Sequence, residues 1–384
     1  MKKLLLHIGM PKAGSTSIQH FLKDNEELLA ARQIHYLKAG MGREQTKHSK
    51  LAQPFASTLI PTATRRKLPK VKLDATAKDL DQALEEIAST DYSVYVISVE
   101  ELFPTFVDDL TIPDSKVAEL YLQWFSKLSE ICEITVVVYL RRQDLFVESL
   151  YAQFQKGGGS PLRLLTFDEF LSNLKAVGVF DYEQIIQNLT QLPGVNGVIV
   201  RPFERSQLVA GDVIADCARF LGIDDISNYV ITGESNTKNF PRQFSIMLYQ
   251  AAIAGTDRQS DKQLRVTFEK MMDSGKKLPE WAQANTGKYF MSPDARAQLV
   301  AEYSAGNDNL AAQYLGSARM FHSEPNDAED PNWTPPVFST DDLSPELASE
   351  SVSTDKPAAS PPRQAGNPSP SQSIGGVLRR LFGN

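Results

Sequence analysis

The sequence predicts a doubly wound α/β fold with three layers and a mainly parallel central sheet. Short, unbroken apolar runs rich in β-branched residues recur between residues 4 and 200, and segments of helical periodicity separate them. Strands that are covered on both faces need such uninterrupted runs, because neither face meets water. Helices between the runs indicate crossover connections, which join parallel strands.

Four runs are expected to form strands: Leu4–Ile8, Tyr92–Val99, Ile134–Leu140 and Gly197–Val200. The helices are expected at Ser15–Asp24, Lys78–Ala88, Val117–Leu128, Leu145–Gln155, Tyr182–Asn188 and Gln207–Leu221. Gly222 follows the last of these directly, and a glycine in that place is typical of a helix C-terminus.

The pattern changes twice towards the C-terminus. After Pro241 the strand signal fades, and Ser292-Pro293-Asp294 has the form of an N-cap with proline at the first helical position. Residues 1–318 are therefore expected to form one α/β domain with a helical C-terminal part. Residues 319–372 are rich in Pro, Ser and acidic residues and are expected to be a disordered linker. Residues 373–384 are expected to form a short amphipathic helix that touches a membrane or a partner, or else a frayed end.

Composition and charge limit the partners. The formal net charge is −7 and the pI is about 5.4, which argues against a nucleic-acid partner. An anionic ligand would therefore need a local cluster of donors. Cys132 and Cys217 lie in apolar stretches and are expected to be reduced core thiols. The N-terminal apolar run is too short for a secretory signal, and no run approaches the roughly 18 apolar residues of a membrane span. A cytoplasmic protein without a transmembrane segment is expected.

A glycine-rich loop, Gly9-Met10-Pro11-Lys12-Ala13-Gly14-Ser15-Thr16-Ser17, follows the first predicted strand. Glycines let backbone amides approach an oxyanion, the three hydroxyls add donors, and the next helix directs its positive end to the same place. Gly9 and Gly14 keep the spacing of a P-loop, but Ser15 stands where that motif has its lysine. The sequence thus predicts a P-loop-like phosphate site, with a simple capped turn as the alternative.

The third predicted strand ends in cations. Arg141 and Arg142 stand where kinase-type P-loop enzymes usually have a carboxylate for magnesium. Arginine binds phosphate with two parallel hydrogen bonds, and Ser149 on the following helix is expected to reach the same group. Arg142 is a competing candidate for this contact, and a solvated arginine pair is the alternative.

These two motifs together resemble those of the sulfotransferases that use 3'-phosphoadenosine-5'-phosphosulfate (PAPS), in particular bacterial and heparan-type carbohydrate members. The segment from Pro11 to Thr16 is similar to the family's PKxGTT or PKxGST loop, and Arg141, Ser149 and Tyr151 fit its second motif. The resemblance covers about residues 1–318.

The resemblance implies a site for PAPS. Gly14, Ser15 and Thr16 would bind the 5'-phosphate, and Lys12 would lie near the oxygen that bridges phosphate and sulfate. The remaining binding residues of this loop would be Pro11, Ala13 and Ser17. Arg141 and Ser149 would bind the 3'-phosphate.

A third segment is similar to the Thr-Lys-Gly-Phe stretch of heparan-type members. It would add Lys238 to the pocket for the 3'-phosphate and adenine. Asn239 replaces the glycine of that stretch, and a polar surface loop is the alternative.

The second predicted strand ends in Glu100 and Glu101, at the edge of the sheet where ligands bind in open α/β folds. Heparan-class relatives use a glutamate as general base, and bacterial relatives often show Ser-x-Glu here, which matches Ser98-Val99-Glu100. Glu100 is therefore expected to be the base, with Glu101 second and His48 as the alternative. No metal-ligating cluster is evident among the five histidines, and no metal is expected.

The resemblance implies transfer of a sulfuryl group from PAPS to a hydroxyl, on a glycan or glycolipid, with adenosine 3',5'-bisphosphate as the product. The basic stretch Arg65–Lys72 and the glycines 157–159 belong to loops that are candidates for acceptor binding. A P-loop kinase or other phosphotransferase, and a non-catalytic nucleotide-binding protein of the same fold, are the alternatives.

Overall fold

The computed structural model describes residues 1–55, 73–106, 115–156, 161–232, 242–253, 287–325 and 333–338, together with residues 266 and 285. Lys238, the basic stretch Arg65–Lys72, the glycines 157–159 and the C-terminal segment 373–384 lie outside the described residues. The predicted linker is described only at 319–325 and 333–338.

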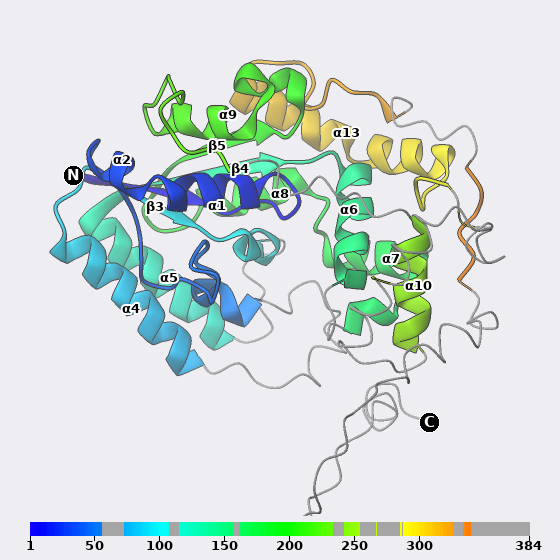
Figure 1. Ribbon diagram of the computed structural model, residues 1–384, viewed down its shortest axis with the longest axis horizontal. Helices are drawn as coiled ribbons and strands as arrows, with labels where there is room; N and C mark the ends of the chain where they lie inside the picture. Colours follow the sequence, from blue (N-terminus) through cyan, green and yellow to red (C-terminus); the bar gives the residue numbers. More distant parts are fainter. Residues whose placement is uncertain are drawn as a thin grey trace, which may run out of the picture. The chain divides into compact units, whose positions relative to one another are not determined.

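A five-stranded sheet with the strand order β2-β3-β1-β4-β5 forms the centre of the fold (Figure 1). The strands are β1 (Lys2–His7), β2 (Ile34–Tyr36), β3 (Val94–Ser98), β4 (Cys132–Leu140) and β5 (Val195–Pro202). All four pairings are parallel. The predicted α/β class with a parallel sheet is confirmed, and β2 is a strand that the sequence analysis missed.

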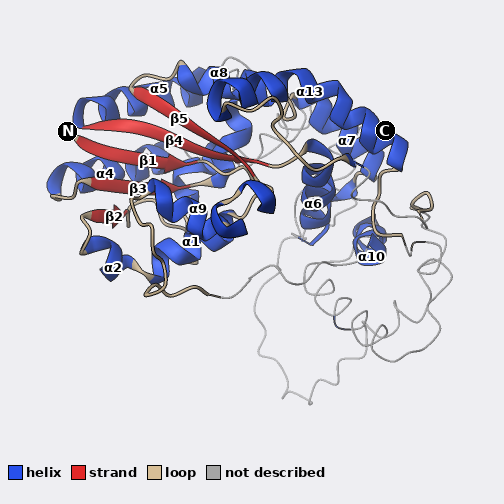
Figure 2. Ribbon diagram, turned by 90° about the horizontal axis from the view of Figure 1, so that it is seen from above, coloured by secondary structure: helices blue, strands red, loops and turns tan. Residues whose placement is uncertain are grey.

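Helices cover both faces of the sheet (Figure 2). The helices α1 (Ser15–Asp24) and α9 (Val213–Phe220) lie on one face, and α5 (Ser115–Ile131) and α8 (Tyr182–Thr190) lie on the other. The sheet is thus the middle of three layers, which explains its apolar runs. Side chains from β1 and β4 are fully buried, among them Leu4, Leu6, Val136, Val138 and Leu140.

The other α-helices in the described part of the chain are α2 (Glu26–Ala30), α4 (Leu73–Ser89), α6 (Gln143–Lys156), α7 (Phe167–Val177), α10 (Arg242–Ile253) and α13 (Pro293–Leu315). The helix predicted from residue 207 instead begins at Val213. Asp212 accepts hydrogen bonds from the amides of Ile214 and Ala215 at 2.7 and 3.1 Å, so it is the N-cap. Ala210 has a φ of 53°, which interrupts any helix before that point.

The contacts within the chain group it into two compact units. The first contains the sheet and consists of residues 1–150, 171–239 and 293–329. The second consists of residues 151–170, 240–292 and 330–384. The single domain predicted for residues 1–318 is divided between these units. Every predicted site residue that the structure describes belongs to the first unit.

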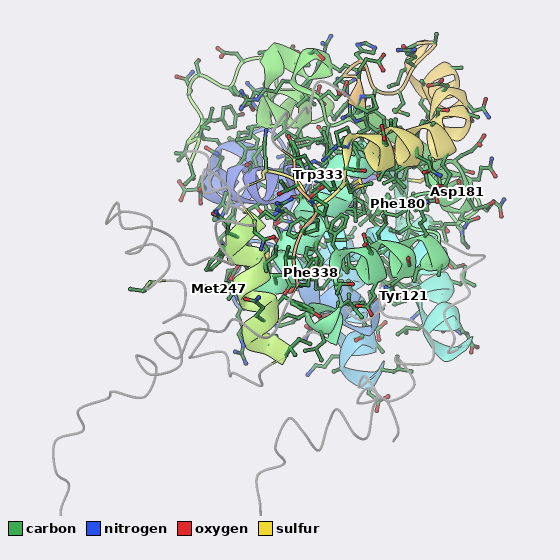
Figure 3. The ribbon with its side chains drawn as sticks, turned by 90° about the vertical axis from the view of Figure 1, so that its right-hand side faces the viewer. Tyr121, Phe180, Asp181, Met247, Trp333 and Phe338 are labelled. Carbon is green, nitrogen blue, oxygen red and sulfur yellow. The ribbon has the colours of Figure 1, made fainter. Side chains whose placement is uncertain are left out.

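An aromatic cluster packs the second unit. The ring of Tyr151 contacts Phe167 and Phe290. Phe338, which is labelled in Figure 3, contacts Tyr249. The Tyr151 hydroxyl donates a hydrogen bond to the carbonyl of Leu165 at 3.0 Å. Tyr151 is therefore a core residue, although its spacing fits the second sulfotransferase motif.

A buried cluster of charges fixes the first turn of α6 in the first unit. The Arg142 guanidinium donates to both carboxylate oxygens of Asp144, at 2.7 and 3.0 Å, and to the carbonyl of Ser323 at 2.6 Å. Arg296, from α13, donates to Asp144 at 2.6 Å. Arg142 is only 1% exposed, so its side chain serves this cluster.

Replacement of Arg142 by alanine is expected to lower the free energy of unfolding by about 3 kcal/mol. This value is at the low end of the loss expected when a buried ion pair is broken. The loss is limited because Arg296 would still donate to the Asp144 carboxylate in the variant. The matched control is Lys127→Ala, whose ion pair with Asp81 joins two side chains that are 59% and 67% exposed. Its effect is expected to stay within about 0.5 kcal/mol. Urea denaturation measures both, and equal losses would contradict a structural role for Arg142.

Candidate functional site

The candidate site lies at the carboxyl ends of β1, β3 and β4. The chain leaves β1 towards β2 on one side of the sheet and leaves β4 towards β5 on the other, although β1 and β4 are neighbours. Such a reversal is a topological switch point, where ligands bind in open α/β sheets. Both predicted phosphate motifs begin here, one after β1 and one after β4.

The loop after β1 begins as an extension of the sheet. The amide of Met10 donates to the carbonyl of Tyr139 at 3.0 Å, and the amide of Tyr139 donates to the carbonyl of Gly9 at 2.7 Å. The Ser15 hydroxyl donates back to the carbonyl of Met10 at 3.2 Å and is buried. The chain then turns through Lys12, whose φ is 67°. These bonds hold the loop in one conformation.

The start of α1 completes the loop. Gly14 is its N-cap in a left-handed conformation, with a φ of 79°, and no side chain caps the helix. A Cβ at Gly14 would lie 2.9 Å from a ring carbon of Phe203, so a larger residue is excluded sterically as well. Ala13 is buried, Thr16 is exposed, and Pro11 and Ser17 are half-buried. The positive end of α1 thus faces the loop.

Arg141 lies directly against this loop. Its Nη1 donates to the carbonyl of Lys12 at 2.8 Å, and the Tyr182 hydroxyl donates to the carbonyl of Arg141 at 2.7 Å. Burial and the nearby Arg141 guanidinium lower the pKa of Lys12. An anion beside these two cations would relieve their repulsion. Ser149 is half-buried on α6, eight positions beyond Arg141.

The two glutamates follow β3 at the same edge. Gly9 packs on Glu100 so closely that an added Cβ would lie 2.9 Å from the Glu100 Cβ. Glu100 accepts hydrogen bonds from Gln19 at 2.5 Å and from Lys47 at 2.9 Å. Lys47 also donates to Glu101 at 2.5 Å. Burial and the charge of Glu100 raise the pKa of Glu101.

The sequence analysis missed two members of this group, Gln19 and Lys47. Gln19 is 2% exposed on the inner face of α1 and also donates to the Ser98 hydroxyl at 3.2 Å. The same hydroxyl lies 2.8 Å from Nδ1 of His7, which is buried at the end of β1. In the sequence, the available signal for Gln19 was its place beside Ile18 and Phe21 on the predicted helix.

His48 has a structural role, because both of its ring nitrogens are bonded to the backbone, which leaves neither to act as a base. It is fully buried, its Nε2 donates to the carbonyl of Leu37 at 3.0 Å, and its Nδ1 accepts from the amide of Ser98 at 3.1 Å. Burial lowers the pKa of His48 to about 4, so the ring is neutral near pH 7. With both ring nitrogens bonded to the backbone, His48 anchors its loop to β3.

Across the residues that the structure describes, no group of three or more His, Cys, Asp or Glu side chains is arranged to hold a metal ion. No described helix has both the length and the apolar character needed to cross a membrane.

Comparisons with known proteins give few matches. No protein-family model matches the chain. An uncharacterized protein of Archaeoglobus fulgidus is 27% identical over 199 residues, which are 51% of this chain and 50% of the relative. The chain thus matches about half the length of that relative.

Among solved structures, a match comes from a study of the PezAT chromosomal toxin-antitoxin system of Streptococcus pneumoniae. It is 15% identical and covers 71% of this chain and 87% of the other, with a TM-score of 0.27. A likeness at that TM-score carries no functional argument.

Proposed function

We propose that this chain is a sulfotransferase that moves a sulfuryl group from PAPS to a hydroxyl of a glycan or glycolipid. The observation that carries the proposal is the hydrogen bond of 2.8 Å between Arg141 and the carbonyl of Lys12. It joins the end of β4 to the loop after β1. The two motifs expected to bind opposite ends of one doubly phosphorylated nucleoside therefore adjoin.

Donor binding would use charge-assisted hydrogen bonds. The backbone and hydroxyls from Gly14 to Ser17, with the start of α1, suit the 5'-phosphate. Arg141 and Ser149 suit the 3'-phosphate, because a guanidinium makes two parallel bonds to one phosphate. Each such bond contributes about 1.5–3 kcal/mol, which is enough for a few of them to hold a multiply charged anion on an acidic chain.

Transfer would be an in-line displacement at sulfur. The acceptor oxygen forms the new S–O bond while the bond between sulfur and the bridging oxygen breaks. Glu100 takes the hydroxyl proton, and Lys12 stabilises the negative charge that develops on the leaving oxygen. The close approach of Gly9 to the Cβ of Glu100 supports these roles, because Glu100 then adjoins the loop that would hold the sulfuryl group.

Two features weigh against a magnesium-dependent kinase. Arg141 directly follows β4, where such enzymes usually hold magnesium with a carboxylate, and the carboxylates at this edge, Glu100 and Glu101, follow β3. The loop lysine, Lys12, precedes the second glycine of the motif, whereas the P-loop lysine follows it.

The first test is binding of adenosine 3',5'-bisphosphate without magnesium, measured by isothermal titration calorimetry. Arg141→Ala is expected to weaken binding about 10- to 150-fold, which corresponds to 1.5–3 kcal/mol. The control is Arg219→Ala, which changes an exposed arginine on α9 and is expected to leave the Kd unchanged. No binding to the wild-type chain would defeat the proposal, and magnesium-dependent ATP binding would favour a kinase instead.

The second test concerns the base. With ³⁵S-labelled PAPS and a panel of glycans and glycolipids, Glu100→Gln is expected to slow transfer by about 10²–10⁴-fold. Its affinity for the bisphosphate is expected to stay within about twofold, because the base acts on the acceptor. Glu85→Gln, an exposed position on α4, is the matched control. A chain that binds the bisphosphate but transfers no sulfate to any acceptor would indicate a non-catalytic binding protein.

A further inference from the structure

We propose that Lys47 is a positioning residue that holds Glu100 and Glu101 together beside the phosphate loop and keeps Glu100 able to accept a proton. The second half of this inference rests on the proposed sulfotransferase function. The first half concerns the geometry of three side chains and is testable without it.

The contacts define a clamp around Glu100. Lys47 Nζ lies 2.9 Å from one carboxylate oxygen of Glu100 and 2.5 Å from an oxygen of Glu101. Gln19 donates to the other oxygen of Glu100 at 2.5 Å. The side chains of Lys47, Glu100 and Glu101 are 27%, 17% and 29% exposed, so water screens these contacts only in part. Glu100 is therefore held at both oxygens, by donors from two different segments.

The segment that carries Lys47 is tied down on both sides. The amide of Leu37 donates to the carbonyl of Val96 at 3.2 Å, and the amide of His48 donates to the carbonyl of Ser98 at 3.0 Å. The Tyr36 hydroxyl donates to the carbonyl of Thr46 at 2.6 Å. Because β3 fixes both ends of this loop, the backbone of Lys47 is already ordered when the side chain meets the glutamates.

Other charged and titratable groups also face the pair. His7 at the end of β1 is buried with a pKa lowered to about 4 by burial, so it is neutral near pH 7. Burial, the larger cause, and the charge of Glu100, the smaller one, both raise the pKa of Tyr36. Burial also lowers the pKa of Lys12, and Arg141 lowers it further, although Glu100 acts in the opposite direction. For Lys12, burial and the Arg141 charge together outweigh the attraction of Glu100, and the pKa of Lys12 is lowered.

Lys47 behaves in the opposite way. Burial disfavours its charge, but the attraction of Glu100 and Glu101 outweighs burial and raises the pKa of Lys47. It therefore stays protonated over the whole neutral range. Without it, two adjacent carboxylates would repel each other, and the pair would take up a proton at a higher pH. A glutamate that already carries that proton cannot accept one from a hydroxyl.

The test compares three variants of the full chain. Lys47→Met removes the charge and keeps the length, Lys47→Arg keeps the charge, and Lys50→Met changes an exposed lysine three residues on as the control. The first measurement is Tm between pH 5 and pH 9. The second is release of labelled sulfate from PAPS with water as the acceptor, over the same pH range. The third is calorimetric binding of adenosine 3',5'-bisphosphate.

We expect Lys47→Met to lower Tm by about 5 °C at pH 8 and by less than half of that near pH 5. The sign follows from the repulsion: both carboxylates are ionised at pH 8, and acidification protonates one of them more readily in the folded variant than in the unfolded chain. The acid limb of its rate profile should move up by about one pH unit, and Lys47→Arg should restore the wild-type limb. Lys50→Met should match wild type throughout, and bisphosphate affinity should stay within about twofold in all variants.

Three outcomes would overturn the inference: an unchanged acid limb, a reduced affinity for the bisphosphate, or a Tm deficit that does not depend on pH. An acid limb that stays in place in Lys47→Met would leave the clamp purely structural. A bisphosphate affinity reduced by about tenfold or more would make Lys47 a donor ligand instead. If the wild-type chain binds no bisphosphate, the sulfotransferase proposal fails by itself. The Tm measurement then still decides the clamp, because a deficit that is the same at every pH would refute it.

Discussion

The parallel pairing of β1 with β4 is the constraint on which the candidate site depends. β1 ends at His7, opposite Val137, whereas β4 continues to Leu140. The last residues of β4 therefore have no strand partner in β1 and bond instead to the loop, through Gly9 and Met10. This fixes the loop in register with β4, so that Arg141 emerges beside the carbonyl of Lys12. The contact between the two phosphate motifs is thus a consequence of unequal strand lengths.

The chain has a formal net charge of −7, yet cationic side chains gather at this edge of the sheet. The neighbouring arginines at the end of β4 separate: Arg141 lies on the loop, and Arg142 turns inwards to the buried Asp144. Asp144 satisfies Arg142 and Arg296 together, and this anchors the start of α6, from which Ser149 projects. One arginine is therefore left for the loop because the other is fully used by the core. Local geometry, and not net charge, makes this edge suitable for an anion.

The sequence predicts an element of the fold when the residues that define that element form one contiguous pattern. The strands buried on both faces were visible as apolar runs, but β2 has three residues with His35 in the middle and resembles a loop. The start of α9 was misjudged because the cap at Asp212 lies inside a stretch of helical periodicity.

The same distinction applies to the site. Gly9 to Ser17 and Arg141 were found because each motif is contiguous in the sequence. Gln19 and Lys47 were missed because their contacts with Glu100 join residues 81 and 53 positions apart. His48 was misinterpreted because its polar neighbours, Lys47 and Ser49, give no sign that the ring is buried.

A carboxylate base beside a phosphate loop has an electrostatic difficulty that the observed clamp addresses. In the proposed mechanism, the elements that bind the anionic donor also bring its negative charge close to the carboxylate of Glu100. Lys47 donates a charge-assisted hydrogen bond to one oxygen of Glu100, and the Gln19 amide donates to the other, so both oxygens have donors of their own. Arg141 donates to the carbonyl of Lys12 in the loop, whereas Glu100 receives its hydrogen bonds from Lys47 and Gln19. In the proposed mechanism, a second lysine, on a loop anchored by His48, would let one edge of the sheet bind a polyanion and hold the base in place at the same time.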